Sequence, residues 1–459
     1  GAIAEAVPGD DIVMCDGSWT DIMLDFAVIG TEEEPIILWA ETPGNVTLEG
    51  ESWLRMSGEY AWVSGLVMTN GYSQDDVAAV DFRGNTGATG MCSNCRLTNF
   101  AMIEWNPASA DTYYWWVLMR GTDNRIDHSY FSGKEHSGPL LSVYRPTGDA
   151  NYHQIDNNYF GEVAPCTVNG CETIIVGDSV YADDSSYTTV EDNYFYYANG
   201  EAEVISNKSS NNTYSRNTFE QCAGLLTLRH GHDNVVDGNY FFVDGTDWAG
   251  GIRVHGADNI VINNYVRNSP TGGTDDSSLW RGGVVLGSGD GSPTNYENVE
   301  NTIIAHNTIV NSEHSFVYGV GGYPNAPTDT LIAYNLVYVE EGVIDGPLIR
   351  EIIELEDTTY VDNIFYGADL GIDTPDGISI EDPMLTEDAD GIHRPDTGSP
   401  AIDVIDEPIT EVEFDMEGQA RELPYDIGAD EVSEEDTNMA PLSADEVGPR
   451  SFDAAMLRR

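Results

Sequence analysis

The 459-residue chain carries 79 acidic and 19 basic side chains, which gives a formal net charge of −60 at pH 7. Because 41% of the residues are apolar and 10% are aromatic, the composition predicts a folded acidic protein and excludes a disordered acidic chain. A surface of this charge also excludes nucleic acid and anionic membranes as binding partners.

Lysine is almost absent from the sequence. Only Lys134 and Lys208 are present, against 17 arginines. This pattern favours a protein from a halophilic organism, because the Debye length falls to about 3 Å in 1 M salt and self-repulsion is screened. A merely acidic protein that avoids aggregation is the alternative, but it gives no reason for the selective loss of lysine.

The chain begins with GAIAEAVPGDDIVMCDG, which lacks the basic and apolar segments of a signal peptide. No stretch approaches the roughly 18 apolar residues of a membrane helix. A mature secreted protein would have the same features, so this segment leaves the location open.

Six cysteines are dispersed through the first half of the chain. Cys92 and Cys95 have the Cys-x-x-Cys spacing, but no second such pair completes a zinc site. A local disulfide or buried thiols are therefore expected rather than a metal. The other four are Cys15, Cys166, Cys171 and Cys222.

A short phrase recurs along the chain from about residue 125 to residue 366. The intervals from Asn193 to Asn264 are 24, 22 and 25 residues, and longer intervals occur elsewhere. A unit this short cannot bury its own apolar face, so it must stack on its neighbours. The copies are RIDHSYF, QIDNNYF, TVEDNYF, TYSRNTF, VVDGNYF, IVINNYV, IIAHNTI, LIAYNLV and YVDNIFY, with Ser129, Asn158, Asn193, Asn217, Asn239, Asn264, Asn307, Asn335 and Asn363 in one column.

The repeat predicts an all-β fold, a single right-handed parallel β-helix. Its strands are short and β-branched, Asn, Asp and Gly separate them, and no helical periodicity lies between them. Stacked coils lie about 4.8 Å apart, so the asparagine column is expected to form a hydrogen-bonded ladder with a structural role.

Two longer intervals, from Asn158 to Asn193 and from Asn264 to Asn307, are expected to hold loops that leave the stack and build a groove. From about residue 433 the repeat stops. The predicted organisation is a β-helix domain over residues 1–432 and a mobile acidic tail over residues 433–459.

The segment EAEVISNKSS places Glu201, Glu203 and Lys208 close together in sequence. Residues two apart in an extended strand face the same way, so the two carboxylates are expected side by side. Like charges this close need a cation between them, and Ca²⁺, which takes six to eight oxygen ligands, fits that need. Lys208 has the wrong parity for one straight strand, so a turn is expected between it and the glutamates.

The spacing of the cations also follows the repeat. Arg229 lies 21 residues after Lys208, and Arg253 lies 24 residues after Arg229. These three side chains are expected one above another in successive coils. Asn169 lies 32 residues before Glu201, a spacing of one coil and its insertion. It is a candidate carbonyl ligand for the same metal.

Around these residues the sequence resembles polysaccharide lyase family 6, the alginate lyases and chondroitinase B. The resemblance covers roughly residues 1 to 432. It is carried by AEAVPGDDIVMCDGSWTD, FSGKEHSGPLLSVYR, GEAEVISNKSSNNTYSRNTF, LTLRHGHDNVVDGNYF, GGIRVHG and the closing SPAID and DIGADE.

The resemblance implies a calcium-dependent lyase that cleaves alginate, an anionic polysaccharide, by β-elimination outside the cell. Lys208 would be the Brønsted base and Arg229 the general acid. Glu201, Glu203 and Asn169 would hold Ca²⁺. Arg253, His230, Arg145 and Lys134 would contact substrate.

The implied chemistry explains why Lys208 is kept. A lysine that has lost its proton can accept the C5 proton of a uronate, whereas arginine stays protonated and cannot. Water is an alternative to Arg229 as the donor to the leaving oxygen.

Three other functions compete with alginate cleavage. A lyase acting on dermatan sulfate would need extra cations for the sulfates, and this chain is short of them. A β-helix glycoside hydrolase acting on pectin would use paired carboxylates and need neither lysine nor calcium. A noncatalytic glycan-binding surface protein would explain the repeat and the acidity but not the predicted stack of cations.

Overall fold

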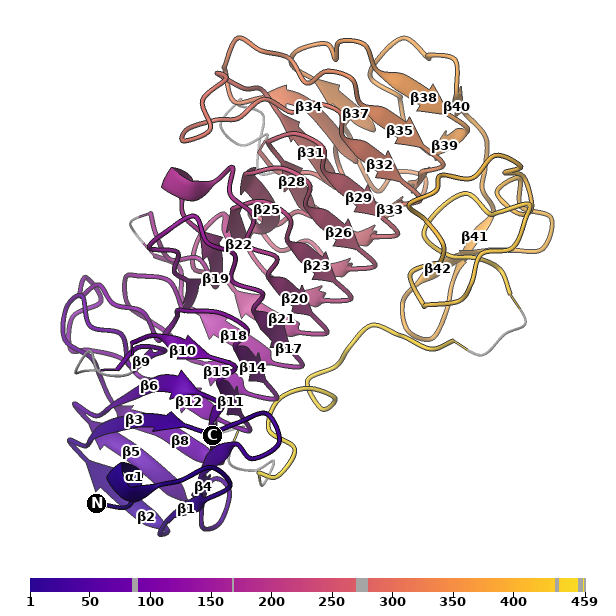
Figure 1. Ribbon diagram of the computed structural model, residues 1–459. Coiled ribbons are helices and arrows are strands. Elements are labelled where there is room, and N and C mark those ends of the chain that lie inside the picture. Colours follow the sequence, from indigo (N-terminus) through magenta and orange to yellow (C-terminus); the bar gives the residue numbers. More distant parts are fainter. Residues whose placement is uncertain (85–89, 167–168, 270–279, 434–436, 453–456, 458–459) are drawn as a thin grey trace. The chain divides into compact units, whose positions relative to one another are not determined.

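The structure is a computed structural model that describes residues 1–84, 90–166, 169–269, 280–433, 437–452 and 457 (Figure 1). It divides into two compact units. The first comprises Gly1–Ser209 with Leu442–Arg459, and the second comprises Ser210–Pro441.

The first unit is built from three parallel sheets, with a short helix α1 (Ala2–Glu5) at its start and a 3-10 turn η1 (Ser179–Tyr181). Its first sheet contains β1 (Asp11–Met14), β4 (Ile36–Ala40), β7 (Ala61–Ser64), β11 (Arg96–Thr98), β14 (Arg125–Asp127), β17 (Gln154–Asp156) and β20 (Thr189–Glu191). Its second contains β2 (Gly17–Thr20), β5 (Val46–Gly50), β8 (Leu66–Gly71), β12 (Ala101–Ile103), β15 (Tyr130–Ser132), β18 (Tyr159–Val163) and β21 (Tyr194–Ala198). Its third contains β3 (Met23–Ile29), β6 (Trp53–Glu59), β9 (Val80–Asp81), β10 (Cys92–Ser93), β13 (Val117–Met119), β16 (Leu141–Val143), β19 (Ile174–Gly177) and β22 (Glu203–Lys208).

The second unit repeats the arrangement. Its first sheet contains β23 (Thr213–Ser215), β26 (Val235–Asp237), β29 (Ile260–Ile262), β32 (Ile303–Ala305), β35 (Leu331–Ala333) and β38 (Thr359–Val361). Its second contains β24 (Thr218–Glu220), β27 (Tyr240–Phe242), β30 (Tyr265–Arg267), β33 (Thr308–Val310), β36 (Leu336–Tyr338), β39 (Asn363–Tyr366) and β40 (Ile378–Ser379). Its third contains β25 (Leu225–His230), β28 (Ile252–Val254), β31 (Val284–Gly287), β34 (Phe316–Val320) and β37 (Ile349–Glu351), and β41 (Leu385–Glu387) pairs antiparallel with β42 (His393–Pro395).

These sheets confirm the predicted parallel β-helix. Successive strands of a sheet come from successive copies of the repeat, and their inward side chains stack on one another. Phe131 lies 5.3 Å from Phe160, and Phe160 lies 5.1 Å from Phe195, measured between ring centroids. All three rings are fully buried. The aromatic position of the repeat therefore builds the core.

The predicted asparagine ladder is present in both units. In the second unit, Asn217 donates to the side-chain oxygen of Asn239 at 3.0 Å, and Asn239 donates to that of Asn264 at 2.9 Å. A second ladder, which the sequence reading missed, joins Asn234 to Asn259 at 3.1 Å. Each ladder amide also binds backbone groups, so buried polar groups at the turns are satisfied.

Replacing Asn239 with alanine is expected to lower the free energy of unfolding by about 3 kcal/mol. The change removes the acceptor for the Asn217 backbone N–H and a donor to the Tyr214 carbonyl, and buried groups left unpaired cost about 1–3 kcal/mol each. Denaturant unfolding measures the loss. The exposed Asn45, whose amide is 3.5 Å from Asp16, gives a matched Asn45→Ala control that should change little.

The insertion between Asn264 and Asn307 is not wholly a loop. Residues 284–287 of this segment form β31, which pairs with β28 and β34 in the third sheet. The predicted loop is therefore wrong over this part, because the short apolar run GGVVLG fits a buried strand. Residues 270–279 of the same insertion lie outside the described residues.

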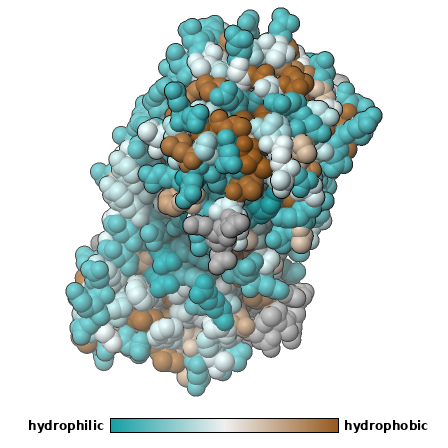
Figure 2. Space-filling model, turned by 90° about the vertical axis from the view of Figure 1, so that its right-hand side faces the viewer, coloured by the Kyte–Doolittle hydropathy of each residue, from teal (hydrophilic) through white to brown (hydrophobic). Residues whose placement is uncertain are grey.

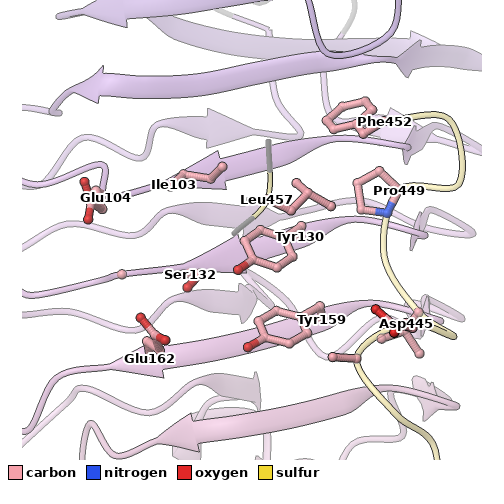
Figure 3. Close-up of a pocket in the computed structure, with 13 residues that line it drawn as sticks. Ile103, Glu104, Tyr130, Ser132, Tyr159, Glu162, Asp445, Pro449, Phe452 and Leu457 are labelled. Atoms are coloured by element: carbon pink, nitrogen blue, oxygen red, sulfur yellow. The ribbon is translucent and has the colours of Figure 1, made fainter. Parts of the chain in front are cut away.

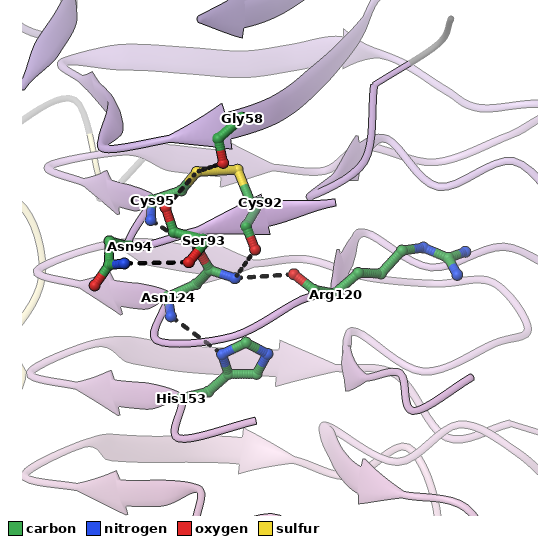
Figure 4. Close-up of a disulfide and its surroundings, with 8 residues drawn as sticks. All are labelled: Gly58, Cys92, Ser93, Asn94, Cys95, Arg120, Asn124 and His153. Carbon is green, nitrogen blue, oxygen red and sulfur yellow. Dashed lines mark hydrogen bonds between the residues drawn. A yellow bond between two sulfur atoms is a disulfide. The ribbon is translucent and has the colours of Figure 1, made fainter. Parts of the chain in front are cut away.

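Two local disulfides confirm the expectation for the cysteines. Cys92 is joined to Cys95, and Cys166 is joined to Cys171. Asn124 donates to the carbonyl of Cys92 at 3.2 Å and accepts the N–H of Cys95 at 2.8 Å, which anchors the first disulfide to the turn of the next coil (Figure 4).

Part of the C-terminal segment packs on the second sheet of the first unit. Val447 packs with Tyr159 and Tyr194, and the N–H of Gly448 donates to the Asn157 carbonyl at 2.8 Å. Tyr130, Tyr159 and the tail residue Phe452 line a cavity of about 470 Å³ (Figure 3). The predicted boundary at residue 432 and the mobility of residues 433–459 stay predictions.

Hydrophilic side chains predominate on the face shown in Figure 2, where hydrophobic residues form local groups. Among the helices of the described residues, none has the length and apolar character needed to cross a membrane.

Candidate active site

Lys208 is the last residue of β22, and Glu203 is the first. The two therefore share one strand, and the turn expected between them is absent. The bend lies earlier, at residues 200–202, so Glu201 precedes the strand and is not part of it. Lys208, at the end of β22, lies beside a carboxylate from the segment just before β19, the neighbouring strand of the sheet.

That carboxylate belongs to Glu172, which the sequence reading missed. In the third sheet Ile174 of β19 lies opposite Ile205 of β22. Glu172 and Glu203 each lie two residues before these paired isoleucines, so the two glutamates are neighbours. The Lys208 Nζ lies 3.7 Å from Glu172 Oε1. The Lys208 side chain is 23% exposed, so its amine is half-buried beside the acid.

Glu172, Glu201 and Glu203 form a carboxylate cluster in which one oxygen of each lies within 4.8 Å of the others. Glu172 and Glu203 are buried. Burial and the two neighbouring carboxylates raise the pKa of Glu201 to about 7. Burial also raises the pKa of Glu172, although Lys208 opposes the change.

The carboxylate cluster fits a hard cation. Glu172 Oε2 is buried and has no hydrogen-bond partner among the residues that the structure describes, and a buried oxygen left unpaired is costly unless a ligand binds it. The donors are all oxygens, the ligands that Ca²⁺ prefers. Asn169, the third predicted ligand, is exposed and precedes Gly170, whose N–H donates to Glu201 at 3.1 Å. Its role as a ligand stays a prediction.

A second group of acids in the second unit differs from this cluster. Asp415, Glu417 and Asp430 also bring one oxygen each within 4.8 Å of the others. However, Arg394 already lies among them, since it binds Glu417 at 2.6 Å and also binds Asp430. We therefore read this group as an ion-pair network and not as a cation site.

Lys134 lies in the same part of the first unit as the carboxylate cluster, and only 1% of it is exposed. Its amine donates to the His136 carbonyl. Burial lowers its pKa to about 7, and the charge of Glu172 opposes this shift. Its predicted contact with substrate stays a prediction, since the contacts seen here are internal.

Arg145 is also buried, with 1% exposed. Its guanidinium holds the backbone around η1, and its predicted contact with substrate likewise stays a prediction. The accepting carbonyls belong to Gly148, Asp149, Tyr181, Asp184 and Ser185.

In the second unit, Arg229 is held by a loop that follows β31. Its guanidinium lies 3.8 Å from the ring centroid of Tyr296, and its Nη1 donates to the Asn295 carbonyl at 2.7 Å. Stacking on an aromatic face and one carbonyl contact fix the plane of the guanidinium.

Arg253 of β28 faces the same side of the third sheet, but it is not directly above Arg229. The register places Arg253 opposite Thr227, two residues before Arg229. The two arginines lie on adjacent strands, as expected of successive coils, but their exact alignment was predicted wrongly, because loop lengths differ between coils and an average period does not fix register. Arg253 lies 5.0 Å from the ring centroid of Trp280, and His230 is buried.

Comparison with known families decides the assignment. A family model described as chondroitinase B matches residues 1–407. The chain belongs to the chondroitinase B family, polysaccharide lyase family 6. A search of curated proteins gave no significant match.

Solved structures of family 6 members agree with this assignment. The alginate lyase AlyGC is 30% identical to the chain with a TM-score of 0.83, and the alignment covers 98% of this chain and 57% of AlyGC. The chain thus spans little more than half the length of AlyGC. A mannuronic acid-specific family 6 lyase from human gut microbiota is 30% identical with a TM-score of 0.74, covering 82% of this chain and 86% of that one. The alginate lyase AlyF-OU02 is 24% identical with a TM-score of 0.75, covering 96% of this chain and 90% of that one, and supports the fold alone.

Sequence reasoning missed Glu172 of the carboxylate cluster, and it missed the aromatic residues on which the two arginines rest, Trp280 and Tyr296. Glu172 follows a cysteine directly before the strand TIIVG, so its position at a strand start was the available signal. Trp280 and Tyr296 come from the long insertion, where no periodicity predicts the direction of a side chain.

Proposed function

We propose that this protein is a calcium-dependent lyase that cleaves alginate by β-elimination and leaves unsaturated uronate ends. We further propose that it acts outside the cell and in concentrated salt. The observation that carries the proposal is the contact of Lys208 with the carboxylate cluster on a family 6 fold.

Lys208 is proposed as the base that removes the C5 proton of the uronate. Lys208 is the last residue of β22 and its side chain is partly exposed, so a sugar lying on the third sheet can reach its amine. Glu172 lies 3.7 Å away and orients the amine. The C5–H electron pair forms the C4=C5 double bond as the C4–O4 bond breaks, and O4 leaves with a proton.

Glu172, Glu201 and Glu203, with Asn169 as a further candidate, would hold Ca²⁺. When bound, the ion supplies positive charge that neutralises the substrate carboxylate and so makes the C5 proton more acidic. The chain contributes the converged oxygens and keeps Lys208 beside them.

Arg229 is proposed as the proton donor to O4, and Arg253 as a contact for a substrate carboxylate. Both guanidinium groups rest on aromatic rings, at 3.8 Å from Tyr296 and 5.0 Å from Trp280. A guanidinium held in this way suits planar recognition of a carboxylate. His230, Lys134 and Arg145 are proposed to act in substrate binding as the family resemblance implies.

We propose alginate as the substrate because two solved relatives that are 30% identical to this chain are described as an alginate lyase and as a mannuronic acid-specific lyase. Dermatan sulfate is the second candidate, since the matching family is described as chondroitinase B. With 19 basic residues in 459, the chain is poorly supplied with cations for sulfate groups.

Incubation with alginate, dermatan sulfate and pectate in molar salt with Ca²⁺ tests the proposal. We expect alginate oligosaccharides whose mass spectra show one unsaturated uronate end per cleavage. Products that have gained water would indicate hydrolysis and contradict the lyase. Cleavage of dermatan sulfate alone would replace alginate as the substrate.

A further inference from the structure

The Cys166–Cys171 disulfide lies directly beside the carboxylate cluster. The two cysteines are five positions apart, and Cys171 is the residue before Glu172. The disulfide therefore fixes the backbone from which one carboxylate of the cluster projects.

The cross-linked segment also touches the backbone that leads into Glu201. The N–H of Cys166 donates to the Gly200 carbonyl at 2.9 Å. A Cβ placed on Gly200 would lie 2.1 Å from the carbonyl oxygen of Cys171, so no side chain fits between the two backbones. Gly200 immediately precedes Glu201, so this contact fixes the backbone from which the Glu201 side chain projects.

A third contact reaches the Glu201 carboxylate itself. The N–H of Gly170, one position before Cys171, donates to Glu201 Oε2 at 3.1 Å. Glu172 Oε2 is buried and has no hydrogen-bond partner within the described part of the chain. Ionised carboxylates whose oxygens lie within 4.8 Å of one another repel, so contacts that hold their backbones in place favour the converged arrangement.

We propose that the Cys166–Cys171 disulfide is a positioning element of the cation site. It holds Gly170 and Glu172 against the Gly200–Glu201 backbone, so that the oxygens are already converged when a divalent cation arrives. The inference rests on the proposed function, in which this cluster takes Ca²⁺. Preorganised ligands lose less conformational freedom on binding, and loss of an outer-shell partner typically weakens metal binding by about 10–100-fold.

Calorimetric titration with Ca²⁺ tests this role in the full chain. The variant carrying Cys166→Ser and Cys171→Ser is expected to bind Ca²⁺ about tenfold more weakly than the wild type. The matched control carries Cys92→Ser and Cys95→Ser, which removes the disulfide shown in Figure 4, whose neighbours are Gly58 and Asn124. The control is expected to lower Tm but to keep the wild-type Kd for Ca²⁺.

Wild-type affinity in the variant lacking Cys166 and Cys171 would overturn the proposal, as would an equal loss of affinity in the control. If the variant fails to fold, Gly200→Ala offers a second route. It keeps the disulfide but forces the Cys171 carbonyl away from the Glu201 backbone, and the same weakening is expected.

The wild-type titration separates this inference from the proposed function. Absence of Ca²⁺ binding by the wild type would overturn the cation site and the positioning role together. Ca²⁺ binding by the wild type together with an unchanged Kd in the double variant would overturn the positioning role alone.

Discussion

Replacing Lys208 with alanine is expected to lower kcat on alginate by about 10³-fold, within the range of general-base contributions. The variant loses the group proposed to accept the C5 proton, while the carboxylate cluster keeps its three acids. Initial rates at saturating substrate and Ca²⁺ measure the effect.

Lys208→Arg is the stricter comparison. Arginine keeps the positive charge beside Glu172, but it stays protonated and cannot accept a proton. We expect this variant to be as inactive as Lys208→Ala, with wild-type Ca²⁺ affinity and a Tm near that of the wild type. A kcat near the wild-type value in either variant would show that another group removes the proton.

Replacing Glu201 with glutamine is expected to weaken Ca²⁺ binding by at least about tenfold, because one of three converged charges is lost and the shape is kept. At limiting Ca²⁺ the rate of alginate cleavage should fall as less of the variant binds Ca²⁺, and excess Ca²⁺ should restore much of this rate. Activity measured against Ca²⁺ concentration, after removal of metal with a chelator, gives the shift.

The exposed Glu59, in β6 of the same unit, provides the control Glu59→Gln. This variant loses the same charge away from the carboxylate cluster and should keep the wild-type dependence on Ca²⁺. Equal dependence in Glu201→Gln, Glu59→Gln and the wild type would contradict a cation site at Glu201.

The fold was predictable because it depends on features that repeat. The aromatic position and the asparagine column recur in nearly every coil, so each copy supports the interpretation of the others. The second ladder includes Asn234 and Asn259, each directly before a copy of the repeated phrase, and it was missed because other coils hold His153, Thr188 or Thr302 at this position.

The site was predictable only in part, because it depends on the register between coils. Glu172 joins the carboxylate cluster through the pairing of β19 with β22, and the chain between them does not reveal that pairing. For the same reason the sequence did not reveal that Arg253 lies opposite Thr227 and not opposite Arg229. Trp280 and Tyr296 depend on the path of an insertion, which residue spacing does not encode.

Scarcity of lysine was the most useful signal. Lys134 is buried, Lys208 is partly buried, and both interact electrostatically with Glu172. The chain has therefore kept lysine at one place in the first unit, where the proposed chemistry requires an amine that can lose its proton.

The most direct test of this account is the ultraviolet absorbance of the C4=C5 double bond during incubation with alginate and Ca²⁺ in molar salt, for the wild type and for Lys208→Ala. The account predicts a rising signal for the wild type and almost none for the folded variant. A signal of equal size in both proteins would contradict the assignment of Lys208, and no signal from the wild type on any polyuronate would contradict the lyase itself.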